Sequence, residues 1–91
     1  MSALAPAHEA LTILIADDSA TDLLLLSTIV RRQGHQVLTA ANGREAVEVF
    51  TRARPQLVLM DIHLPFFNGY HWCQEIRKVS KVPVLFLSSA S

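Results

Sequence analysis

The chain lacks most of the features that mark specialised classes of protein. Among its 91 residues there is one cysteine, Cys73, so no internal disulfide can form and a reducing compartment is indicated. Lysine plus arginine and aspartate plus glutamate number 8 each, which leaves neither a basic excess for nucleic acid nor an acidic tail. The longest uncharged, largely apolar run, residues 23–30, is far shorter than the ~20 residues of a membrane span.

The remaining composition is typical of one small globular domain. Hydrophobic residues make up 51% of the chain, which is too many for a disordered segment. Residues 1–11 are rich in alanine and have neither the positive start nor the sustained apolar stretch of a secretion signal, so we expect a flexible leader followed by one domain at 12–91. We therefore expect a cytoplasmic protein, with no membrane and no nucleic acid among the partners of this chain.

Short apolar runs alternate with segments of helical periodicity. The runs are continuously apolar rather than alternating, which indicates strands covered on both faces, as in a parallel sheet. We expect an α/β, flavodoxin-like parallel sheet of order 2-1-3-4, joined by right-handed crossovers. The expected strands are residues 12–16, 36–40, 57–60 and 83–87, and the expected helices are residues 20–33, a segment between Asn42 and Pro55, and a third that ends at Arg77-Lys78.

The first expected helix carries a run of four leucines at residues 23–26. Helical spacing groups four apolar residues, Leu25, Leu26, Ile29 and Val30, so we expect them on the buried side. Leu23 and Leu24 then face outward. The helix is expected to begin after Ser19, whose hydroxyl can cap it.

Acidic residues follow two of the expected strands at the points where those strands end. Asp17 and Asp18 follow the first strand, and Asp61 follows the third. Ligands bind at the carboxyl ends of strands in open parallel sheets, and neighbouring strands would bring the three carboxylates together. Such a cluster repels itself, and a hard divalent cation, Mg²⁺, would relieve the repulsion. The structural alternative, that each aspartate only caps a helix or closes a turn, explains any one of them more easily than all three.

Several segments together resemble the receiver (CheY-like) domain of two-component response regulators. The resemblance runs from about Thr12 to Ser91, nearly the whole chain. It is carried by Ile-Leu-Ile-Ala-Asp17-Asp18-Ser, Val-Leu-Met-Asp61-Ile-His-Leu-Pro65, Asn68-Gly69 and Pro83-Val-Leu-Phe-Leu-Ser88-Ser.

The resemblance implies a role for each matching residue. Asp61 would be the phosphoacceptor, receiving a phosphoryl group from a histidine kinase or phosphotransfer protein. Asp18, Asp61 and the backbone carbonyl of His63 would hold Mg²⁺, and Asp17 would reach the ion directly or through water. Ser88 would be the hydroxyl that moves toward the phosphoryl oxygens. Such a module accepts a phosphoryl group and is not an enzyme, beyond catalysing its own phosphorylation.

The chain departs from the receiver pattern after the fourth strand. The family's last helix-strand-helix is lacking, and with it the lysine that contacts the phosphoryl group, so we expect Asp61 to react more slowly than in a complete receiver. Neither nearby lysine substitutes, because Lys81 lies ~23 Å before Ser88 along the strand and Lys78 ends the third helix on the same far side.

The apolar fourth strand, residues 84–87, would be left as an unpaired edge, which favours a homodimer or higher self-association. An alternative function follows, a truncated or engineered receiver fragment that self-associates without signalling. Residues 1–60 hold five arginines and no lysine, whereas residues 61–91 hold one arginine and two lysines. We therefore keep the hypothesis that the chain joins two receiver halves of different origin.

Overall fold

The computed structural model describes residues 9–88, and the ordered elements alternate strictly between strand and helix. This alternation and the number of elements confirm the expected α/β class. The elements in chain order are β1 (Thr12–Ala16), α1 (Ala20–Arg32), β2 (Gln36–Ala40), α2 (Gly43–Ala53), β3 (Leu57–Asp61), α3 (Gly69–Arg77) and β4 (Val84–Leu87).

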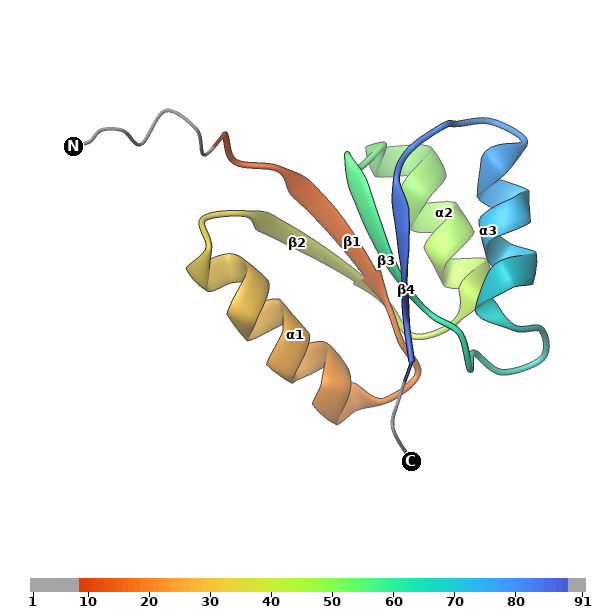
Figure 1. Cartoon of the computed structure of the whole chain (residues 1–91), viewed down its shortest axis with the longest axis horizontal. Coiled ribbons are helices and arrows are strands. Elements are labelled where there is room, and N and C mark those ends of the chain that lie inside the picture. Colours follow the sequence, from red (N-terminus) through yellow and green to blue (C-terminus); the bar gives the residue numbers. More distant parts are fainter. Residues whose placement is uncertain (1–8, 89–91) are drawn as a thin grey trace.

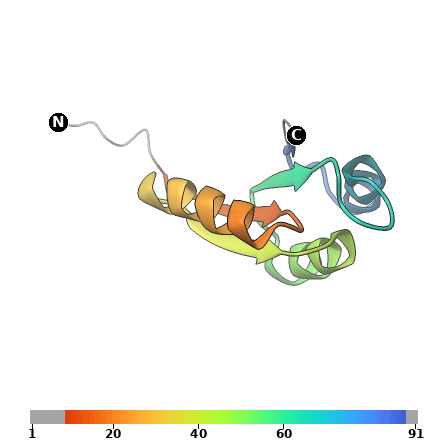
Figure 2. The ribbon, with the colours of Figure 1, turned by 90° about the horizontal axis from the view of Figure 1, so that it is seen from below.

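The four strands form one parallel sheet of order β2-β1-β3-β4, as the sequence predicts. Helix α1 lies on one side of the strands, and α2 and α3 lie on the other (Figures 1 and 2). Because β1 and β3 are neighbours, with Ala16 opposite Met60, the segments that follow them leave the sheet side by side. No helix within residues 9–88 has the length and apolar character needed to cross a membrane.

Each helix begins at a capped N-terminus that the sequence specifies. The side chains of Ser19, Asn42 and Asn68 accept hydrogen bonds from the backbone amides three residues later. Such caps satisfy one of the free amide groups of the first helical turn. The three helices are thereby fixed at their starts, close to the carboxyl ends of the strands that precede them.

The main core lies between the sheet and the pair α2 and α3. Alternate residues of β1 and β3 point into it and meet Phe50 of α2 and Ile76 of α3. Trp72 of α3 packs directly over Gly43, where a β-carbon would collide with the indole ring, so the close approach of α2 and α3 depends on glycine at that position. The largest fully buried side chains of this core are Leu14, Val58, Met60, Phe50 and Ile76.

The expected buried side of α1 is wrong in part. Leu25 is 58% exposed and Ile29 is 50% exposed, whereas Leu23, expected to face outward, is half-buried. The one fully buried residue of the helix is Ser27. Helix α1 packs on β1 and β2, and within residues 9–88 no helix or strand buries Leu25 and Ile29.

The boundaries at the two ends of the sheet differ slightly from the expected ones. Leu11, assigned to the leader, donates its amide to His35 Nδ1 at 3.0 Å and accepts from the Gln36 amide at 2.8 Å, so it is hydrogen-bonded to the residues beside the start of β2 although β1 itself begins at Thr12. Strand β4 begins at Val84 rather than Pro83. Residues 1–8 of the expected leader and Ser89 lie outside the described residues.

We predict that Phe66→Gly stabilises the fold. Phe66 has a φ of 73°, in the left-handed region, and is 95% exposed, so its ring makes little contact that would compensate. Relief of the backbone strain exceeds the added entropy of glycine in the unfolded chain, so the free energy of unfolding should rise by about 0.5–1 kcal/mol. Chemical denaturation measures the change. Phe66→Ala is the control and should give no gain, and a loss of stability in the glycine variant contradicts the prediction.

Candidate functional site

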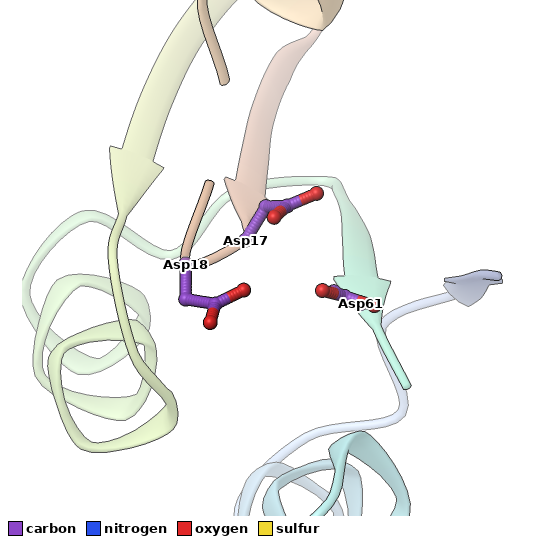
Figure 3. A group of neighbouring side chains, drawn as sticks. All are labelled: Asp17, Asp18 and Asp61. Atoms are coloured by element: carbon purple, nitrogen blue, oxygen red, sulfur yellow. The ribbon is translucent and has the colours of Figure 1, made fainter. Parts of the chain in front are cut away.

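The three aspartates predicted to meet do meet at the carboxyl end of the sheet. Carboxylate oxygens of Asp17, Asp18 and Asp61 all lie within 4.8 Å of one another. Asp18 and Asp61 direct their carboxylates toward each other, with Asp17 beside them at the end of β1 (Figure 3). Asp17 and Asp61 are buried, at 4% and 6% exposure, whereas Asp18 is exposed. The site is therefore open to solvent on the side of Asp18.

Two of these acids also close the turns that follow their strands. Asp17 Oδ1 accepts a hydrogen bond from the Ser19 amide at 2.9 Å, and Asp61 Oδ1 accepts one from the His63 amide at 3.0 Å. The alternative interpretation, that an aspartate closes a turn, is therefore confirmed for Asp17 and Asp61. These bonds engage Oδ1 alone and orient each carboxylate, while Oδ2 makes no hydrogen bond within the described residues.

A pocket of about 240 Å³ adjoins the cluster on the side of α1. Its walls are acidic at one end and apolar at the other, and Ser88, the predicted switch hydroxyl, lies at its edge and is exposed. The pocket is lined by Asp17, Asp22, Asp61, Leu25, Leu26, Leu87 and Ser88.

Asp22 is a pocket residue that the sequence analysis missed. It lies in the first turn of α1, where its amide donates to Ser19 Oγ at 3.2 Å. Asp22 follows Asp18 by four residues and comes after the capping Ser19, and this spacing could have identified it from the sequence. A helix that begins at a strand's carboxyl end turns its first-turn side chains toward the same edge of the sheet as the acids that precede it.

The pocket concentrates negative charge that no basic side chain in the described part of the chain neutralises. The ion pair found within residues 9–88 joins Lys78 to Glu75 at 2.8 Å, on α3 and away from the acids. Burial raises the pKa of Asp17, and repulsion from Asp61 and Asp22 raises it further against the lowering effect of the Ser19 amide. An oxygen-only donor set with this excess charge fits a hard divalent cation.

The loop between β3 and α3 passes close to Asp61. Gly69 donates its amide to the Ile62 carbonyl at 2.8 Å, and a β-carbon on Gly69 would collide with the backbone carbonyl of Asp61. Glycine at this position lets α3 begin against the end of β3. His63 is exposed on this loop, and its amide contact to Asp61 places its peptide beside the acids.

This fold and acidic edge place the chain in a known family. Residues 13–91 match the family model described as the response regulator receiver domain, and the chain belongs to that family. The assignment agrees with the resemblance carried by the strand-end aspartates and confirms the flavodoxin-like architecture.

Proteins similar to this chain include transcriptional regulators of Bacillus subtilis and Porphyridium aerugineum. The transcriptional regulatory protein YxdJ of Bacillus subtilis is 39% identical over 79 residues, which cover 87% of this chain and 34% of that protein. The probable transcriptional regulator ycf27 of Porphyridium aerugineum is 42% identical over 79 residues, covering 87% and 33%. The chain therefore spans about a third of the length of the curated relatives it matches.

Solved receiver structures have the same fold. Chemotaxis protein CheY4 of Vibrio cholerae superposes with a TM-score of 0.85 at 28% identity, covering 91% of this chain and 72% of that one. The BeF3-activated receiver domain of RstA from Klebsiella pneumoniae gives 0.81 at 29% identity, covering 88% and 68%.

We predict that Asp17→Asn stabilises the protein at pH 7 in buffer with a chelator. Because the folded-state pKa of Asp17 is raised, the native state binds the proton more tightly than the unfolded chain, and the free energy of unfolding falls as pH rises through the ordinary carboxyl pKa. Asparagine removes this penalty and keeps an acceptor for Ser19, so Tm should rise at pH 7.

The advantage should vanish at a pH well below the ordinary aspartate pKa of about 3.9, where the carboxyl is protonated in both states. Asp18→Asn is the matched control and should change Tm less, because its carboxylate is exposed. Thermal unfolding followed by circular dichroism at several pH values measures both variants. A Tm for Asp17→Asn at or below that of the wild type at pH 7 contradicts the prediction.

Proposed function

We propose that the chain is a phosphoacceptor module of two-component signal transduction, with Asp61 as the acceptor. The observation that carries the proposal is the position of Asp61: it ends β3, is 6% exposed, and shares its pocket with Asp17 in a chain of the receiver family. Its carboxylate is oriented by the His63 amide. The partner proposed is a histidine kinase or a phosphotransfer protein that carries phosphohistidine.

The proposed step is a phosphoryl transfer to one carboxylate oxygen of Asp61. That oxygen attacks phosphorus in line with the leaving group, and the P–N bond of the donor breaks. The bonding electron pair leaves on that imidazole nitrogen, the proton already carried by the other ring nitrogen makes the departing imidazole neutral, and Asp61 becomes an acyl phosphate. The acceptor is consumed in each event, so the chain is proposed to be a reaction partner and not an enzyme acting on other substrates.

Asp17, Asp18, Asp61 and the backbone carbonyl of His63 are the proposed holders of Mg²⁺. The support is the group of three carboxylates within 4.8 Å together with the absence of a neutralising base in the described residues. When bound, the ion supplies positive charge that offsets the phosphoryl oxygens. Oδ1 of Asp17 already accepts a hydrogen bond from the Ser19 amide, and Oδ1 of Asp61 accepts one from the His63 amide. The ion would therefore be bound mainly by the other oxygens of the site.

Ser88 is proposed to respond to the phosphorylated state. It follows β4 directly and lines the same pocket as Asp61, whose neighbour across the strands is Leu87. Its hydroxyl can donate a hydrogen bond to a phosphoryl oxygen. The ionised carboxylates around it have no proton to donate, so the hydroxyl accepts no hydrogen bond from them. The proposed setting of this chemistry is the cytoplasm.

A second candidate function is a self-associating fragment that does not signal. It is favoured by the exposed apolar side chains of β4, Leu85 at 56% and Phe86 at 38% exposure, and by the lack of a basic residue at the acidic pocket within residues 9–88. Phosphorylation of Asp61 separates the two candidates, because the fragment function requires none.

We predict that acetyl phosphate with Mg²⁺ adds one phosphoryl group per chain, at Asp61. Intact-mass analysis measures the addition, and treatment with hydroxylamine should remove it, as expected of an acyl phosphate. The Asp61→Asn variant should show no addition, because its amide is not a nucleophile for phosphorus. Omission of Mg²⁺ should reduce the rate at least about tenfold, since the charge of the clustered carboxylates is then not offset.

The matched control is Asp22→Asn, which changes an acid of the same pocket but not the proposed acceptor. It should still be phosphorylated. A phosphoryl group that persists in Asp61→Asn, or a wild-type chain that takes none, contradicts the proposed function.

A further inference from the structure

We propose that a second pocket, between the starts of α2 and α3, binds a small aromatic carboxylic acid. The pocket has a volume of about 360 Å³, and sites for small molecules typically measure about 300–1,000 Å³. Its walls come from the start of α2, the loop between β3 and α3, and α3 itself, which meet at one end of the sheet (Figure 1).

This aromatic pocket is separate from the acidic pocket around Asp61. The acidic pocket adjoins α1, whereas the aromatic pocket lies between the two helices on the other side of the strands (Figure 2). All of its lining residues fall within residues 42–72, so β4 and the segment after it contribute no wall. The inference therefore goes beyond the proposed function and does not depend on phosphorylation.

The aromatic wall of the pocket is held in place by ring contacts. The ring of Phe67 stacks on His71 with centroids 4.1 Å apart and meets Trp72 edge to face at 5.8 Å. Trp72 in turn packs closely over Gly43 of α2. Rings that are already ordered can bind a flat apolar group without the entropic cost of ordering them. The wall therefore favours an aromatic ligand.

Phe66 is a second apolar wall, and it stands on a strained turn. The Phe67 amide donates to the Pro65 carbonyl at 3.0 Å, and Phe66 between them has a φ of 73°. A three-residue turn with positive φ at its centre is rare and strained, and such strain is found most often at binding sites. The ring of Phe66 is 95% exposed, so a ligand ring in the pocket would cover apolar surface that the described residues leave in water.

A positive charge lies at the other side of the pocket. Arg44 is in the first turn of α2, at the positive end of the helix dipole. It is exposed and makes no ion pair within residues 9–88, where the ion pair found joins Lys78 to Glu75. The neighbouring Glu45 instead accepts a hydrogen bond from the Ala41 amide at 2.7 Å. One guanidinium matches the single charge and the two oxygens of a carboxylate.

Two further donors at the start of α2 have no acceptor. Asn42 Oδ1 accepts a hydrogen bond from the Glu45 amide at 2.8 Å, and the Asn42 amide group donates none within the described residues. Trp72 Nε1 is buried without an acceptor there, and its edge of the indole faces Gly43. Since a buried donor without an acceptor is costly, a ligand that supplies one is favoured. A carboxylate at the start of α2 would accept from Asn42, and from Trp72 once the ring turns toward it.

Titration with 3-phenylpropionate tests the proposal, because this acid joins one ring to one carboxylate. Trp72 is the only tryptophan of the chain, so its fluorescence and its indole N–H signal in a ¹⁵N-labelled chain report on the pocket. Both should change saturably. The neutral 3-phenylpropionamide should bind about fivefold more weakly because it lacks the charge. Cyclohexanepropionate, which lacks the aromatic ring, should also bind about fivefold more weakly.

Variants separate the roles of charge and ring. Arg44→Gln should weaken binding of the acid about fivefold and leave binding of the amide unchanged. The matched control is Arg52→Gln, an exposed arginine of α2 outside the pocket, which should bind the acid like the wild type. Phe66→Gly should weaken binding of both probes about fivefold, and because this variant is expected to be at least as stable as the wild type, unfolding would not explain the loss.

The outcomes that overturn the inference are distinct from those that test Asp61. Overturning results are a titration that does not saturate, equal affinity for the acid and the amide, or equal losses in Arg44→Gln and Arg52→Gln. Amide signals that shift around Asp17 and Asp61 rather than at residues 42–44 and 65–67 also overturn it. None of these results bears on the proposed function, and a chain that takes no phosphoryl group leaves this inference intact.

Discussion

Repulsion among carboxylates at the carboxyl end of the sheet is the constraint on which the functional site depends. Parallel pairing of β1 with β3 fixes where these strands end, and therefore where Asp17, Asp18 and Asp61 stand. No base of residues 9–88 relieves the repulsion. A protein that concentrates acids in this way gives up stability at this edge, as the raised pKa of Asp17 indicates. The cost is understandable if the site is completed by a bound cation.

The rest of the architecture holds those acids in place. The α2 and α3 core fixes β1 and β3 from one face, and the Gly69 and Gly43 contacts allow the helices to approach closely enough to do so. The face of α1 is different, because it lines the acidic pocket with leucines and leaves Leu25 and Ile29 exposed. The same face carries Leu85, because its neighbour Val84 packs against the core on the opposite face. The acidic pocket and the exposed Leu85 therefore lie on the same side of the sheet.

The sequence predicted the elements and the acid cluster well because both depend on local pattern. Continuous apolar runs and capping residues mark β1, β3 and the helix starts, and parallel topology then forces the strand-end acids together. Prediction from the sequence failed where the burial of a side chain depends on what covers the surface around it. Leu25 and Ile29 have the spacing of a buried stripe, but burial requires a partner, and helical periodicity does not reveal whether one is present. Asp22 was missed because a first-turn acid usually complements only the helix dipole.

The central claim, that the three strand-end aspartates form one cation site, is tested most directly by paramagnetic broadening with Mn²⁺ in a ¹⁵N-labelled chain. The account predicts that substoichiometric Mn²⁺ broadens the amide signals of Ser19 and His63, which donate to Asp17 and Asp61, and that Mg²⁺ competes and restores them. The amides near Lys78, at the far end of α3, should remain sharp. Broadening that is absent at Ser19 and His63, or spread evenly over the other acidic residues, would contradict the account.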